Sequence, residues 1–223
     1  GKPNVKAMLT APFGFPYLVL NTKQGPLANV ALRQAVQAAL NDADMMAAGF
    51  GDPKFYSVEA NHYAKGTPFY STAGAESYGK GDTKKASAMV AAAKYDGTPI
   101  KILTSQAYEF HYRIALVMAE NLKAAGFKVD MQVVDWATLI QRRNEAPLWD
   151  IYITHSAVLP EPTLTPPQLG DGAPGWWSSP AKKAALDAFD AETDPAKRGP
   201  LWGKVQEVVY TEVPYIRVGS FNS

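Results

Sequence analysis

Hydrogen-bonding and aromatic side chains gather directly after three predicted strands in segment 100–156. They are Ser105, Gln106 and Tyr108 after the first strand, Asp135 and Trp136 after the second, and His155 and Ser156 after the third. Hydroxyl, amide and imidazole groups can orient a polar ligand, and large amphipathic rings line wet binding clefts. In parallel sheets the carboxyl ends of the strands meet at one edge, where ligands bind. These residue types in this pattern therefore predict a binding site.

The elements that must position these side chains follow from the hydrophobic pattern. Residues 100–103 and 149–153 are apolar strand-like runs, and 129–133 alternate apolar and polar residues. Between the first two strands, residues 107–125 carry an apolar stripe at helical spacing and end at Gly126. A second helix is expected after Trp136. Two successive strand–helix–strand units imply a parallel sheet with right-handed crossovers.

The remaining elements complete an α/β domain with a mainly parallel central sheet and flanking helices. Strands are expected at 5–9, 17–21 and 215–218, with helices capped by Asn29 and Asn41. Further helices are expected at 83–95, after Pro180 and after Pro195. Residues 51–82 form a long loop rich in Gly, Pro and Tyr, of the kind that is usually functional or wraps a partner surface.

A second aromatic feature lies in the Pro- and Gly-rich segment 159–180, which contains Trp176 and Trp177. We expect this loop to fold over the edge that carries Gln106, Tyr108 and His155, because exposed indoles would forfeit their burial. Gln106 and Tyr108 also begin a helix, whose free N–H groups could hold a carboxylate or phosphate.

Composition excludes several other classes of function. The chain has 223 residues, 47% hydrophobic and 19% charged, and a net charge of +1, so it lacks the basic footprint of a nucleic-acid binder. There is no cysteine, which excludes disulfides and thiolate metal sites. The histidines do not share metal-ligand spacing, and neither metal nor cofactor is expected. No membrane span or signal peptide is recognised, which fits a mature, truncated or cytosolic chain.

Catalysis is disfavoured. Glu109 and His111 are two apart on a helix and so point to different faces, and neither a Gly-x-Ser-x-Gly elbow nor a glycine-rich phosphate loop is present. Ser105 or Ser156 could join Asp135 and His155 in an apparent nucleophile set, which keeps a small α/β hydrolase as an alternative. His155 itself is either a ligand contact or a satisfied polar group at a strand end. Trp136 either contacts ligand or plugs the sheet.

An ordered series of motifs resembles the periplasmic dipeptide- and oligopeptide-binding proteins, the family 5 substrate-binding components of ABC transporters. The motifs are Asn29-x-x-Leu32-Arg33-Gln34-Ala35-Val36, Lys85-Ala86, Tyr95-Asp96-Gly97, Val133-Val134-Asp135-Trp136, Trp149-Asp150, Glu161-Pro162, and Trp202 with Gln206 and Glu212-Val213-Pro214. The resemblance implies a longer, two-lobed protein of which residues 1–223 form the second lobe alone. It also implies a periplasmic location, and as partners the first lobe and a membrane permease.

The resemblance also bears on site residues. Peptide-binding members place an aspartate for the peptide amine three residues before the acid of an acid–Pro turn, where this chain has Val158. The resemblance therefore implies a ligand without an α-amine held in that way. His155 falls where a relative carries Trp, and Arg143, or Arg142 beside it, lies near a position where some relatives present Arg to ligand carboxylates.

The expected function is capture of a small polar or peptide-like solute between two lobes and its delivery to a permease. The alternative within this fold is the ligand-sensing lobe of a transcription regulator. An upstream helix-turn-helix would indicate the regulator, and an upstream signal peptide the transporter.

Overall fold

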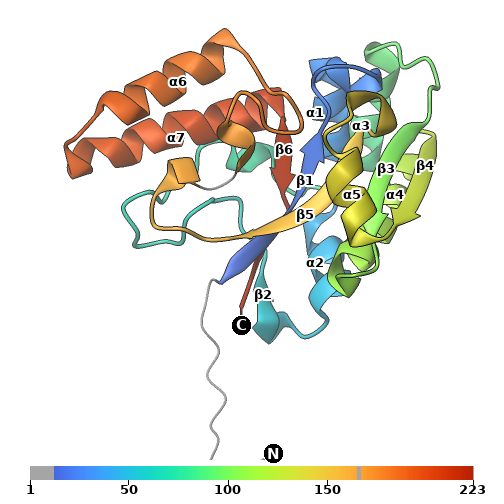
Figure 1. Ribbon diagram of the computed structural model, residues 1–223, viewed down its shortest axis with the longest axis horizontal. Coiled ribbons are helices and arrows are strands. Elements are labelled where there is room, and N and C mark those ends of the chain that lie inside the picture. Colours follow the sequence, from blue (N-terminus) through green and yellow to red (C-terminus); the bar gives the residue numbers. More distant parts are fainter. Residues whose placement is uncertain (1–12, 165–166, 223) are drawn as a thin grey trace, which may run out of the picture.

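The computed structural model describes residues 13–164 and 167–222, and the strand expected at 5–9 lies outside them. The described strands are β1 (Gly14–Leu20), β2 (Tyr56–Ser57), β3 (Ile100–Ser105), β4 (Val129–Val134), β5 (Ile151–Ala157), β6 (Tyr215–Arg217) and β7 (Ser220–Phe221). The α-helices are α1 (Val30–Ala39), α2 (Asp42–Phe50), α3 (Thr83–Ala92), α4 (Glu109–Ala124), α5 (Trp136–Arg142), α6 (Pro180–Ala191) and α7 (Pro195–Glu212). Figure 1 shows them arranged around one central sheet.

The strands form one seven-stranded sheet in the order β2-β7-β1-β5-β3-β4, with β6 also paired to β1. β3 runs parallel to β4 and β5, as predicted, whereas β1 pairs antiparallel with β5, β6 and β7. The α/β class is confirmed, but the sheet is mixed rather than mainly parallel. The reason is that β1 runs antiparallel to all of its neighbours, so on its side of the sheet no two adjacent strands are joined as a parallel strand–helix–strand unit.

Helices cover both faces of the sheet. α1 to α4 pack on one face around Leu18 and Leu20 of β1, and α5 to α7 pack on the other around Tyr17 and Val19. This division follows the alternation of side chains along a strand. α4 and α5 thus cross on opposite faces. α4 connects β3 to β4 on one side of it, and α5 leads back past β3 to β5 on its other side, so the order of the strands reverses at β3. Such a switch point is the usual ligand position of an open α/β sheet.

Local sequence signals explain where the helices begin and end. Asn29, Asn41 and Ser179 accept hydrogen bonds from the backbone N–H groups of α1, α2 and α6, respectively, as expected of N-caps. α4 begins at Glu109, two residues later than predicted, because Tyr108 keeps an extended backbone. It is followed by Gly126, whose φ of 99° is the left-handed conformation that ends helices.

Candidate functional site at the carboxyl edge

The end of the sheet where β3, β4 and β5 finish is here called the carboxyl edge. Ser105 of β3 pairs with Val134 of β4 there, and Ala157 of β5 pairs with Gly14 of β1. Gly14 also pairs with Phe221 of β7. Residues far apart in the sequence are therefore collected at one edge.

Six rings form a continuous aromatic cluster at the carboxyl edge: Tyr108, Phe110, His111, Trp136, His155 and Phe221. The Tyr108 ring lies edge-on to His155, at 4.8 Å between centroids, and to Trp136, at 5.0 Å. Phe110 lies 5.4 Å from His155, and Phe221 lies 6.3 Å from it. His155 is thus at the centre of the cluster, and Tyr108 is its most accessible hydrophobic member, with 38% of the residue exposed.

A histidine pair anchors this cluster. His111 Nε2 and His155 Nδ1 are 3.0 Å apart, so one imidazole donates and the other accepts. Burial, and secondarily His155, lower the pKa of His111 to about 3, and burial also lowers the pKa of His155. Both rings are therefore neutral at neutral pH, which suits hydrogen bonding and stacking with an uncharged part of a solute.

Replacing His111 by Phe should reduce the acid sensitivity of the chain. Because the pKa of His111 in the folded state lies below its ordinary value of 6.5, its contribution to stability is present above that pH and is lost as the pH falls toward 3. The loss at pH 5 should be about 1–2 kcal/mol. Urea unfolding at pH 8 and pH 5 measures this, and the wild type should lose more stability than His111→Phe. Equal losses in both proteins would show that His111 is not buried in its neutral form.

The other polar residues predicted at this edge serve mainly the backbone. Buried Ser105 accepts a hydrogen bond from the Ala107 N–H at 3.2 Å, and the Ser156 hydroxyl donates to the Ala157 carbonyl at 3.3 Å. Asp135 caps α5 by accepting from the Thr138 N–H, which places Trp136 at the first helical position. Gln106 is exposed just before α4. In the described structure neither serine hydroxyl is bonded to His155.

Val158 lies just beyond β5 at the same edge. It is half-buried, its N–H donates to the Phe13 carbonyl at 3.1 Å, and its side chain packs against the core that contains Phe15. Gln106, Tyr108, Trp136, His155, Ser156 and Val158 are therefore brought to one edge, as the topology predicts.

The prediction that the tryptophan loop folds over this edge is wrong. Trp176 stacks on Trp149, which precedes β5, with 5.6 Å between ring centroids. Trp177 is 3% exposed, and its indole N–H donates to Glu212 at the end of α7. The loop thus lies at the amino end of β5, where Trp177 is buried and Trp176 is partly buried without a ligand.

Arg143 also lies away from the aromatic cluster. Its carbonyl accepts a hydrogen bond from the Trp149 indole at 3.1 Å, which places the end of α5 near the start of β5. Burial raises the pKa of Tyr152 to about 12, and the Arg143 guanidinium and a hydrogen bond from Gln168 oppose this rise. The neighbourhood of Arg143 is therefore an internal polar network.

Three members of the cluster, Phe110, His111 and Phe221, were not predicted as site residues from the sequence. A signal for His111 was present, since it lies three residues after Tyr108 at the start of a helix and so shares that end of the helix. No local signal could place Phe221, because its position depends on the pairing of β7 with β1.

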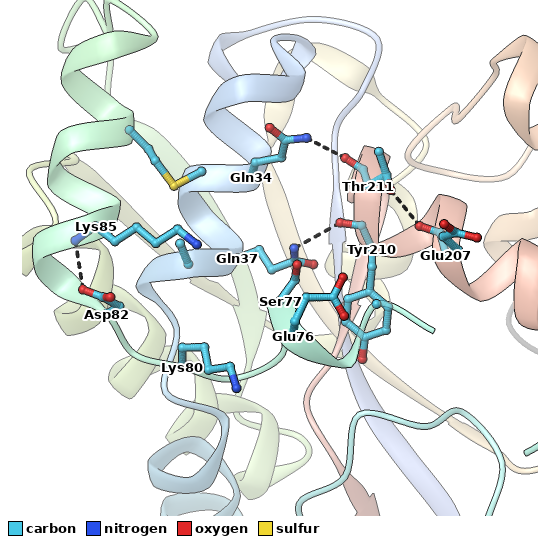
Figure 2. Close-up of a pocket in the computed structure, with 13 residues that line it drawn as sticks. Gln34, Gln37, Glu76, Ser77, Lys80, Asp82, Lys85, Glu207, Tyr210 and Thr211 are labelled. Atoms are coloured by element: carbon cyan, nitrogen blue, oxygen red, sulfur yellow. Dashed lines mark hydrogen bonds between the residues drawn. The ribbon is translucent and has the colours of Figure 1, made fainter. Parts of the chain in front are cut away.

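A separate cavity of 320 Å³ lies between α1, α3 and the end of α7 (Figure 2). The amides of Gln34 and Gln37 line it, but they donate to the carbonyls of Thr211 and Tyr210, at 2.8 and 3.1 Å. These bonds satisfy carbonyls of the last turn of α7, so the amide groups of this cavity already have a structural role.

Comparison with known proteins identifies the family of this chain. Residues 1–173 match the family model of the bacterial extracellular solute-binding proteins, family 5 (middle region). The chain belongs to this family. Within the described part of the chain, no helix is long and apolar enough to cross a membrane, and no group of three acidic, histidine or cysteine side chains could hold a metal ion.

Similar proteins are considerably longer. A probable peptide ABC transporter periplasmic-binding protein from Sinorhizobium fredii is 23% identical over 91% of this chain, which spans 40% of that protein. The ABC transporter substrate-binding protein CtaP from Listeria monocytogenes superposes with a TM-score of 0.86 at 17% identity, over 96% of this chain and 45% of that one. The oligopeptide-binding protein AppA from Bacillus subtilis, solved with a nonapeptide, gives 0.78 at 18%, over 99% and 47%. The family 5 chain therefore has the fold of just under half of these structures.

Proposed function

We propose that this family 5 chain is one lobe of the substrate-binding component of an ABC importer, and that its aromatic cluster is one wall of an interlobe cleft. The observation that carries this proposal is the position of the cluster. It combines neutral imidazoles, an exposed Tyr108 ring and Trp136 at the switch point of the sheet. Sites for small solutes have this composition of aromatic walls with a few polar groups.

The chemistry of such a site is non-covalent. Closure of a second lobe over the cluster would remove water, let Tyr108 and Trp136 pack on the solute, and leave the imidazoles to orient it. The solute stabilises the closed state because it contacts both walls only there. A peptide-like or other small polar solute fits this wall, and the location that fits this role is the periplasm, with delivery to a membrane permease.

Substitution of Tyr108 tests this assignment in the two-lobed protein. Tyr108→Ala should weaken solute binding by at least about tenfold, or roughly 1.4 kcal/mol, because an exposed ring loses its contact with the solute. The matched control is Tyr70→Ala, since Tyr70 has a similar exposure of 36% but lies beside α7 at residues 199–207. Calorimetry with the solute that co-purifies measures both. Equal affinities for the two variants would contradict a site at the cluster.

A second substitution tests specificity. Val158→Asp places a carboxylate at the end of β5, where peptide-binding relatives are expected to hold the ligand amine. It should therefore strengthen binding of a free-amine dipeptide by about tenfold, because the carboxylate pairs with the ammonium group at the partly exposed end of β5. Val30→Asp, which adds the same charge at the start of α1, should leave this affinity unchanged. Tight binding of unmodified dipeptides by the wild type would contradict the interpretation of Val158.

A further inference from the structure

A second hollow lies beside the carboxyl edge, on the other face of β7 from the aromatic cluster. Phe221 of β7 points into the cluster, whereas its neighbours Ser220 and Asn222 line a cavity of 240 Å³. Side chains alternate along a strand, which explains this division. Ser57, Asn61 and Arg217 also line the cavity.

Arg217 is the unusual member of this lining. Its side chain is 8% exposed, and its guanidinium lies 4.1 Å from the Phe15 ring. One terminal nitrogen donates to the carbonyl of His62, and the other donates to the Ser220 hydroxyl at 2.8 Å. Its buried Nε has no partner in the described structure. This Nε is too buried for a ligand in the cavity to reach, but a guanidinium has five N–H donors, and each terminal nitrogen keeps a second N–H beyond the bonds to His62 and Ser220.

The charge of Arg217 is also uncompensated. Among the described residues no carboxylate forms an ion pair with it, and the groups that favour its charged form are the side chains of Tyr63, Tyr78, Tyr210 and Tyr215. Burial lowers the pKa of Arg217 to about 10, so it is still protonated at neutral pH. A buried cation without a counter-ion is destabilising, and a bound anion would remove that cost.

The rest of the lining selects among anions. Glu59, whose carboxylate accepts from Asn61 at 2.9 Å, borders the same cavity. Glu59 repels a doubly charged phosphate more strongly than a singly charged carboxylate, and a carboxylate matches one guanidinium and can accept from the hydroxyls of Ser57 and Ser220. The volume of the cavity, 240 Å³, is several times the roughly 30 Å³ that one water molecule occupies in the liquid. A small organic acid therefore fits in it.

We propose that this cavity is a binding site for one carboxylate group, held by Arg217 and Ser220. Only the origin of that carboxylate, a transported solute, rests on the proposed function. The site itself belongs to this chain and can be tested on it alone.

The test follows the side-chain Nε–H signal of Arg217 in ¹H–¹⁵N spectra of the 223-residue chain, assigned by its loss in Arg217→Lys. Sodium acetate should shift the signal saturably, whereas sodium chloride at equal ionic strength should not, and inorganic phosphate should act more weakly than acetate. Glu59→Gln should tighten acetate binding several-fold by removing a like charge, and Ser220→Ala should weaken it.

An Arg217 signal that acetate leaves unchanged in both the wild type and Glu59→Gln would overturn the site and leave Arg217 as a structural brace. A stronger response to phosphate would overturn the assignment to carboxylates. If Arg217→Lys does not fold, the signal is identified by its shift in Ser220→Ala, which retains Arg217 but removes its hydrogen bond to the Ser220 hydroxyl. A negative titration would reject the carboxylate site without affecting the proposed transport role. If the solute does not bind at the aromatic cluster, the proposed function is rejected, but the titration result still holds.

Discussion

Calorimetry should show that the proposed two-lobed protein binds its solute at least about a hundredfold more tightly than the 223-residue chain, a difference of about 3 kcal/mol. The physical reason is that the aromatic cluster is an open wall in this chain. Tyr108 is 38% exposed, and Phe13 at the same edge is 51% exposed. A solute on this wall keeps part of its surface in water and loses the contacts of the opposite wall.

The control for this comparison is Tyr108→Ala in both proteins. If the cluster is one wall of a shared cleft, the substitution should weaken binding in the two-lobed protein and remove what binding remains in the single lobe. Equal affinity of the wild-type chain and the two-lobed protein would mean that this lobe holds the whole site, and the shared cleft would be rejected.

Replacement of Trp149 should strongly destabilise the chain. Trp149 is 1% exposed, packs edge-on to Tyr152 at 4.8 Å and stacks on Trp176. Trp149→Ala leaves a large cavity and frees the Arg143 carbonyl, so it should lower the free energy of unfolding by about 3–5 kcal/mol. Urea denaturation of the chain measures the loss.

The matched control is Trp136→Ala, because Trp136 is only partly buried in the aromatic cluster. It should cost about 1–2 kcal/mol. If both substitutions lower the free energy of unfolding by the same amount, it is wrong to distinguish Trp149 as a structural residue at the amino end of β5 from Trp136 as a surface residue at the carboxyl edge.

The sequence predicts those parts of the fold that depend on local chemistry. The caps Asn29 and Asn41, the stop at Gly126 and the strands of segment 100–156 are confirmed because each is determined by neighbours within one turn or one strand. The edge that collects Tyr108 and His155 could also be predicted, since two strand–helix–strand units determine where strand ends meet.

Long-range packing could not be predicted in this way. Trp176 and Trp177 can bury their rings against either end of the sheet, and only the positions of Trp149 and Glu212 favour the amino end. The pairing of His111 with His155 joins residues 44 apart in the chain. The antiparallel half of the sheet depends on β1 pairing with strands near the end of the chain, which periodicity does not specify.

The most direct test of a binding wall at the aromatic cluster is a crystal structure of the proposed two-lobed protein with the solute that co-purifies from its host. We expect the solute to contact the rings of Tyr108 and His155 at the carboxyl edge, with the second lobe closed over it. A solute seated elsewhere, for example in the 320 Å³ cavity between α1, α3 and α7, would contradict it.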